Sequence, residues 1–249
     1  MRCYRAGKIV QRALFLPNLG LVEGGGATQG SHRVTFNTYH RLLRGMAAAF
    51  VILGAAMPAA AHPHMCVGAE ATVLYEKGAF TGLKQKWTFT DERYIAEAVE
   101  GLDTNKDGKL DRAELDALAK INVEGLKEFD YFTIATVADQ PVKLGEAFDY
   151  WLEHTEGALH LYFTLRFATA VPVGDKSLEL GVRDTSYFIA FGLPKVSDSI
   201  RLATGTPARC RVAVELPEAE EQTTTKQILE ALGCAITMPK AIKVVCDGP

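Results

Sequence analysis

The amino-acid sequence predicts an α+β domain: a mainly antiparallel, sandwich-like β-structure with an inserted helix-loop-helix unit. Three observations support this prediction. Several stretches alternate strictly between apolar and polar residues, and helical spacing is concentrated on either side of one acidic loop. The composition, 48% hydrophobic and 23% charged, is that of an ordinary globular protein.

A secretory signal peptide is predicted ahead of this domain. Residues 46–61 form an apolar run that follows Arg41 and Arg44, ends in three alanines, and is too short for a stable membrane span. A basic region, an apolar region and an Ala-x-Ala site, in this order, are what a signal peptidase recognises. We therefore assign residues 32–61 to a signal peptide, and we expect a periplasmic protein with no membrane span after cleavage.

The remaining chain divides into two parts. Residues 1–31 are rich in Gly and lack hydrophobic periodicity, which indicates either upstream sequence from a misassigned start or a disordered extension. Residues 62–249 are predicted to form a single periplasmic domain. They keep 20 Lys/Arg against 29 Asp/Glu, a net charge of −9. Such an acidic domain does not bind nucleic acid through a basic patch, and it is short for a two-lobed solute-binding protein.

Alternating residues predict the strands. Leu83, Gln85, Trp87 and Phe89 alternate with polar residues, and the odd-numbered residues from Leu159 to Phe167 form a second apolar row. Further strand-like runs cover 67–75, 132–137, 178–183, 187–191, 211–216 and 243–246. Turn residues separate several of these runs, which favours a mostly antiparallel sandwich.

Helical spacing is found in three stretches. Residues 91–102 carry apolar side chains at Ile95, Val99 and Leu102, and residues 114–129 carry them at Leu115, Leu118, Ile121 and Leu126. A weaker helix is predicted over 224–232, with Gly233 as its stop signal. The first two helices flank one loop, so we place an EF-hand-like insertion at about residues 91–130.

The loop at 103–114 matches the EF-hand calcium template at every specified position. The predicted calcium ligands are Asp103, Asn105, Asp107, the carbonyl of Lys109, Asp111 and Glu114, while Gly108 allows the sharp turn. Leu110 supplies the contact that usually pairs two such loops, yet no second loop is found. We therefore expect a structural Ca²⁺ site rather than a sensor. The alternative is an acidic turn that binds no calcium.

Four cysteines remain after signal cleavage, namely Cys66, Cys210, Cys234 and Cys246. An even number in an oxidising compartment favours disulfides, and four cysteines allow three connectivities. We expect Cys210 to pair with Cys246, because each lies on a strand-like segment and neighbouring strands bring sulfurs within bridging distance. The sequence does not place Cys66 against Cys234.

Cleavage after residue 61 leaves His62-Pro63-His64 as the new amino terminus. In an extended chain residues i and i+2 point the same way, so both imidazoles face one direction. A square-planar metal site at a terminal X-X-His motif needs deprotonated backbone amides at the second and third residues. Pro63 has no N–H to lose, so this site cannot form. The amine and ring of His62, with His64 and a distant ligand, then suit Ni²⁺, Co²⁺, Cu²⁺ or Zn²⁺. The alternatives are a frayed end, or a softer site that adds the Cys66 thiolate.

Several short segments, in this order, resemble a known family. They are His62-Pro-His64, Trp87-Thr-Phe89, the acidic loop, Phe129-Asp-Tyr-Phe132, Phe163-Thr-Leu165 and Asp184-Thr-Ser-Tyr187-Phe188. Together they are similar to the bacterial periplasmic family called domain of unknown function one thousand and seven, over about residues 62–246. The chain departs from the family pattern at Cys66, where an aromatic residue is expected, and over 234–239.

The resemblance implies metal handling beside a membrane metal transporter. Family members are described as the periplasmic component of an uncharacterised ABC-type transport system, in the genomic setting of nickel/cobalt transporters. It also implies that His62, His64 and Asp184 contact the metal, with Tyr187 as a neighbour.

Common catalytic motifs, including the nucleophile elbow, the zinc-protease motif and the phosphate-binding loop, are absent from the sequence. We therefore expect a binding protein and not an enzyme. The leading hypothesis is a metal-binding accessory of a transition-metal transport system with a structural calcium site. The alternatives are a calcium-stabilised β adaptor for a protein partner and, third, a redox enzyme with copper at His62.

Overall fold

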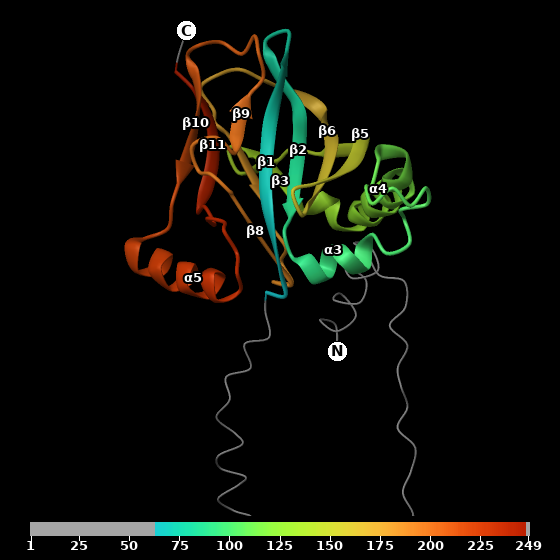
Figure 1. Ribbon diagram of the computed structural model, residues 1–249. Helices are drawn as coiled ribbons and strands as arrows, with labels where there is room; N and C mark the ends of the chain where they lie inside the picture. The colour runs from blue at the N-terminus through green and yellow to red at the C-terminus, as the bar shows by residue number, and fades with distance from the viewer. Residues whose placement is uncertain (1–62, 248–249) are drawn as a thin grey trace, which may run out of the picture. The chain divides into compact units, whose positions relative to one another are not determined.

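Two β-sheets and three α-helices make up residues 63–247, the part of the chain that the computed structural model describes (Figure 1). The predicted segment 1–31, the predicted signal peptide 32–61 and His62 lie outside the described residues. Within residues 63–247 no helix has the length and apolar character needed to cross a bilayer. The mixed, mainly antiparallel architecture confirms the coarse fold prediction.

The first sheet has the strand order β5-β6-β2-β1-β8, with β9 also paired to β1. Its strands are β1 (Met65–Glu76), β2 (Ala79–Phe89), β5 (Leu144–Thr155), β6 (Ala158–Pro172), β8 (Ile189–Gly192) and β9 (Ile200–Leu202). Strands β8 and β9 pair with β1 in parallel, whereas the other pairs of this sheet are antiparallel.

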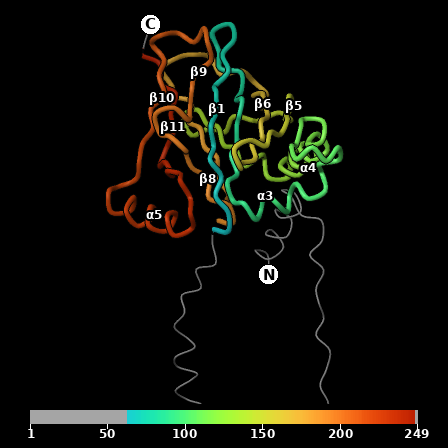
Figure 2. Tube along the Cα trace, viewed as in Figure 1, coloured from blue at the N-terminus to red at the C-terminus, as the bar shows by residue number. Residues whose placement is uncertain are grey.

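The second sheet has the order β10-β11-β7-β3-β4 and is antiparallel. Its strands are β3 (Thr133–Val137), β4 (Gln140–Pro141), β7 (Leu178–Val182), β10 (Cys210–Glu215) and β11 (Ala241–Cys246). The tube in Figure 2 follows the chain between the two sheets.

One face of the first sheet supplies most of the core. The predicted row on β2, from Leu83 to Phe89, is at most 3% exposed, and the predicted row on β6, from Leu159 to Phe167, is at most 6% exposed. One part of this face packs against α3, α4 and the segment after α4, in a cluster that contains Trp87, Phe163 and Leu115. The other part packs against the second sheet, in a cluster that contains Phe80, Leu178 and Val244. Both predicted alternations are therefore confirmed.

Strand β5 has no counterpart among the predicted strands. It lies at the edge of its sheet, and its pairing with β6 shifts register at two places, between Leu144 and Ala147 and between Phe148 and Trp151. Such irregularities break the two-residue period on which strand prediction depends. Leu152 is the strand's one fully buried residue.

The helices are α3 (Glu92–Ala98), α4 (Arg112–Leu126) and α5 (Ala219–Ala231), and a short 3₁₀ segment covers Lys127–Phe132. Helix α3 is shorter than the predicted 91–102, because the chain turns through Gly101 at φ +73°. Helix α4 also ends before the predicted residue 129, since Asp130, Tyr131 and Phe132 all have positive φ. Helix α5 begins earlier than predicted and is followed by Gly233 at φ +72°, as expected for a stop signal.

The prediction that Ile121 faces the core was wrong. Its side chain is 55% exposed, and the inward position is taken by Asn122, which is fully buried. The buried stripe of α4 runs through Leu115, Leu118, Ala119, Asn122, Val123 and Leu126 at helical spacing. A polar residue therefore occupies a place where the pattern favoured an apolar one.

Two disulfides join distant parts of the chain. Cys210 and Cys246 face each other across the β10–β11 ladder and are bonded, which confirms the predicted pair. Cys66, at the start of β1, is bonded to Cys234, just after α5. This bond removes the Cys66 thiolate from the alternative soft metal site, because a disulfide sulfur carries no charge to offer a cation.

Peptide mapping under non-reducing conditions is expected to recover both bonded pairs and no free thiol among these four cysteines. The physical reason is that the backbone already holds each pair together, with Cα atoms 5.9 Å apart at Cys66–Cys234 and 4.0 Å apart at Cys210–Cys246. Recovery of a local Cys234–Cys246 peptide would contradict this connectivity.

Candidate functional site

The parallel pairing of β1 with β8 builds the first candidate site. It aligns Met65 with Ile189, so the residues that precede both strands meet at the same edge of the sheet. The backbone N–H of His64 donates to the carbonyl of Phe188 at 2.9 Å, and their rings lie 4.8 Å apart. We call His64, Asp184, Tyr187 and Phe188 the amino-terminal pole. The structure thus brings two of the predicted metal contacts, His64 and Asp184, into one region.

Asp184 anchors the loop that leads into β8. It is buried, and its carboxylate accepts hydrogen bonds from the Ser186 amide at 2.8 Å, the Ser186 hydroxyl at 2.7 Å and the Ile189 amide at 2.9 Å. These donors fix the loop and, through it, the ring of Phe188 against His64. Tyr187, at the tip of the loop with φ +60°, is 74% exposed.

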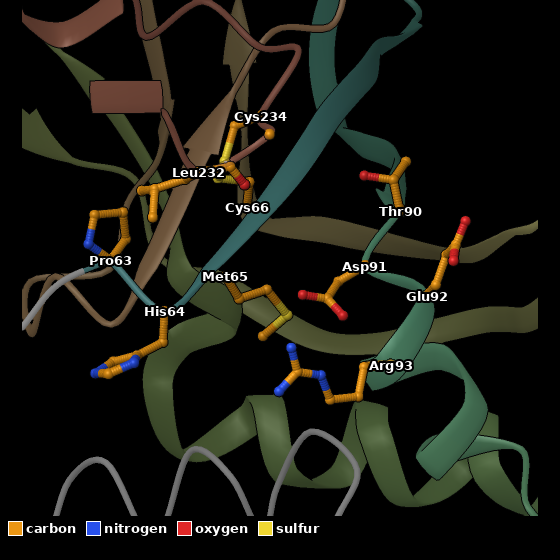
Figure 3. Close-up of a pocket in the computed structure, with 11 residues that line it drawn as sticks. Pro63, His64, Met65, Cys66, Thr90, Asp91, Glu92, Arg93, Leu232 and Cys234 are labelled. Carbon is orange, nitrogen blue, oxygen red and sulfur yellow. A yellow bond between two sulfur atoms is a disulfide. The ribbon is translucent and has the colours of Figure 1, made fainter. Parts of the chain in front are cut away.

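A pocket of about 460 Å³ opens beside the pole. The start of β1, the residues that begin α3 and the end of the α5 segment line it (Figure 3). The Cys66–Cys234 disulfide forms one wall, and the ring of His64 points away from that disulfide in Figure 3. His64 is exposed, so solvent and solutes reach its imidazole.

Two carboxylates from the beginning of α3 share this pocket with His64. Asp91 is the N-cap of α3, and its carboxylate accepts from the amide of Tyr94 at 2.9 Å. Glu92 is exposed and makes no side-chain hydrogen bond or ion pair in the described part of the chain. Glu92 is therefore the acidic side chain of the pocket that is available to a ligand. Sequence reasoning missed it, because nothing in its neighbours links it to a histidine almost thirty residues earlier.

The acidic loop between α3 and α4 is the second candidate site. Backbone amides inside the loop donate to its side chains: Asp103 accepts from Asp107 and Gly108, Asn105 accepts from Asp107, and Asp107 accepts from Lys109. The side chains at these three predicted ligand positions thus accept hydrogen bonds from amides of the loop itself.

Glu114 closes the loop. One carboxylate oxygen accepts from the amide of Thr104 at 2.8 Å, and the other accepts from the amide of Asp111 at 3.1 Å. Asp111 in turn accepts from the amide of Glu114, which forms a capping box at the start of α4. The hydrogen bond from the Asp111 amide, followed by those from the amides of Thr104 and Asn105, lowers the pKa of Glu114. The role of Thr104 was not predicted.

Two further residues adapt the loop to its place in the fold. Gly108 has φ +78°, as its assigned turn requires. Leu110 packs against the cluster between the first sheet and the helices. The apolar contact that a second loop usually provides is thus supplied by the domain core.

Within residues 63–247 no group of three or more His, Cys, Asp and Glu side chains is arranged so that it could hold a metal ion. In the acidic loop the carboxylates accept hydrogen bonds from backbone amides of the loop. At the pole, His62 lies outside the described residues, and the oxygens of Asp184 face Ser186 and Ile189.

The family model named "Protein of unknown function (DUF1007)" matches residues 47–240, most of the chain. The chain belongs to this family. This confirms the family resemblance seen in the sequence, and the match spans both candidate sites. Among curated proteins, none matches the chain.

Proposed function

We propose that the protein is an exported, metal-binding accessory of a transition-metal transport system, and that its amino-terminal pole binds the metal. The observation that carries the proposal is the way in which His64 is held. Strand pairing fixes its backbone and the Phe188 ring lies against its imidazole, while the side chain stays exposed beside a pocket. A donor held in this way loses little conformational freedom when a cation binds.

The donor chemistry suits borderline cations. With His62 at the amino terminus, its amine and imidazole add two nitrogen donors to the His64 ring, and Glu92 adds a carboxylate from the same pocket. Nitrogen-rich sets of this kind favour Ni²⁺, Co²⁺, Cu²⁺ or Zn²⁺ over calcium and magnesium. In this proposal Asp184 is a positioning residue, because its oxygens already accept hydrogen bonds from Ser186 and Ile189.

Transport follows from the family resemblance rather than from the geometry. A periplasmic component of an ABC-type system, associated with nickel or cobalt transport, hands a bound cation to a membrane metal transporter or takes it from one. Two disulfides are compatible with an oxidising compartment, where such a component works.

Calorimetric titration with Ni²⁺, Co²⁺, Cu²⁺ and Zn²⁺ at neutral pH tests the pole. A protein that begins at His62 is expected to bind at least about tenfold more tightly, about 1.4 kcal/mol, than one with a single extra residue before it. The extension turns the basic amine into an amide and moves the ring. His64→Ala and Glu92→Gln should also weaken binding, whereas the control His154→Ala should not.

Equal affinities of the extended and unextended proteins would exclude the terminal chelate. Asp184→Asn separates a positioning role from direct ligation. If Asp184 positions the loop, this variant weakens metal binding and also lowers thermal stability in the absence of metal. Loss of affinity with unchanged stability would instead make Asp184 a direct ligand.

A second function is favoured by the acidic loop: a calcium-stabilised β adaptor that binds a protein partner without a transition metal. The carboxylate oxygens of Asp103, Asp107 and Glu114 accept hydrogen bonds from backbone N–H groups. A Ca²⁺ ion could take the place of these N–H donors, and its ligands would then follow the order of the EF-hand template. The contact of Leu110 with the core supports a structural role for the ion. Absence of transition-metal binding in every form of the protein would leave this adaptor as the better proposal.

A further inference from the structure

Helix α5 makes few contacts with the rest of the domain. Leu229 is the buried residue of its 13, whereas Ile228 and the C-cap residue Leu232, one helical turn later, are 50% and 49% exposed. Figures 1 and 2 show α5 standing off from both sheets, joined to them by the segments at its two ends.

The helix is also weak by itself. Three consecutive threonines, Thr223 to Thr225, are poor helix formers, and the N-cap residue Glu218 makes no side-chain capping bond. A helix of this length is marginal in water unless an apolar face is packed. The Cys66–Cys234 disulfide fixes its carboxyl end beside the start of β1. The domain therefore presents α5 on its surface and buries only Leu229 among the helix's residues.

One exposed face of α5 has a definite chemical character. Glu221, Thr224, Ile228 and Leu232 recur at intervals of three or four residues and are all exposed; we call them the α5 stripe. The stripe is acidic at one end and apolar at the other. Around it the helix carries Glu218, Glu220 and Glu230, and its single cation, Lys226, lies 3.7 Å from Glu230.

We propose that the α5 stripe docks a basic, amphipathic segment of another protein, with apolar side chains against Ile228 and Leu232 and a cation against Glu221. Charge complementarity selects this occupant. A second copy of the chain would bring acidic helices and two acidic domains together, which like-charge repulsion opposes. The proposal does not depend on metal binding, although Leu232 also lines the pocket beside His64, so a docked segment would lie next to the amino-terminal pole.

Fluorescence anisotropy tests the docking surface. The probe is a short labelled peptide of Leu and Lys, designed as an amphipathic helix with Leu on one face and Lys on the other. The intact protein is expected to bind this peptide, and the double variant Ile228→Ser/Leu232→Ser is expected to bind it at least about tenfold more weakly. Glu221→Lys should weaken binding as well. Ile134→Ser, which removes an apolar side chain of β3 that is 43% exposed, is the matched control and should leave the affinity unchanged.

Three results would overturn the proposal. The first is no measurable binding of the Leu/Lys peptide, and the second is equal affinity of the double variant and the intact protein. The third is a dimer in sedimentation analysis that the double variant abolishes, which would make a second copy the occupant. Circular dichroism melting of each variant checks that it is folded, and these exposed substitutions are expected to leave the melting temperature unchanged.

Discussion

Replacing Trp87 by alanine is expected to lower the free energy of unfolding by about 3–5 kcal/mol, the usual cost of truncating a buried aromatic side chain. Trp87 is fully buried, with the Phe163 ring 5.0 Å away and the Phe191 ring 4.8 Å away. Its indole N–H donates to the side-chain carbonyl of Gln85 at 2.9 Å. The substitution therefore leaves a cavity and an unpaired buried oxygen.

Urea denaturation of three proteins separates these two effects. Trp87→Phe keeps most of the volume and removes the donor, so it should cost about 1–3 kcal/mol, less than Trp87→Ala. Ile134→Ala, at an exposed position of β3, should change stability by no more than about 0.5 kcal/mol. A loss below about 1 kcal/mol for Trp87→Ala would mean that this part of the core is not packed as described.

A free Ca²⁺ concentration of about one hundred times the dissociation constant is expected to raise the free energy of unfolding by about 2.7 kcal/mol. This raises the melting temperature by about 5–10 °C. Glu114→Gln should remove most of that gain, because Glu114 is the proposed bidentate ligand and closes the loop on Thr104. The matched control is Glu124→Gln, on an exposed face of the same helix, and it should retain the full response.

Tryptophan fluorescence gives an independent readout of the same event. Arg112 follows Asp111 directly, and its guanidinium lies 4.9 Å from the centre of the Trp151 ring, which stacks on Tyr162. Calcium is therefore expected to change the emission of the protein, and Trp151→Phe should abolish the change. Identical melting curves in chelator and in excess calcium would identify the loop as a turn without a metal.

The sequence predicted the regular part of the fold well, because regular strands bury every second residue. The row from Leu83 to Phe89 was predicted for that reason, and so were the facing strands of Cys210 and Cys246. Strand β5 was missed because two register shifts interrupt its period. Asn122 was missed because polar residues seldom face a core. Its amide has no hydrogen-bond partner in the described part of the chain, and nothing in its sequence context marks it as buried.

Much of the candidate site depends on contacts between distant parts of the chain. The acidic loop could be predicted from the sequence, because its residues are consecutive and the EF-hand template fixes their spacing. The contact of His64 with Phe188 and the Cys66–Cys234 bond arise from a parallel pairing and from the path of α5, and neither has a local signal. Glu92 enters the pocket only because α3 begins beside the start of β1.

The parallel pairing of β1 with β8 also constrains how the protein acquires its structure. The first strand of the domain pairs with residues more than a hundred positions later, since Met65 aligns with Ile189, and the disulfide at Cys66 closes a loop of 168 residues. Contacts between residues so far apart in the sequence form slowly, because the entropic cost of closing a long loop comes before the contacts are made. A polypeptide that emerges amino end first therefore cannot complete this sheet until β9, at Ile200–Leu202, has emerged. For a protein exported as proposed above, that delay would leave the chain unfolded during its passage through a membrane channel, so that folding would follow transport.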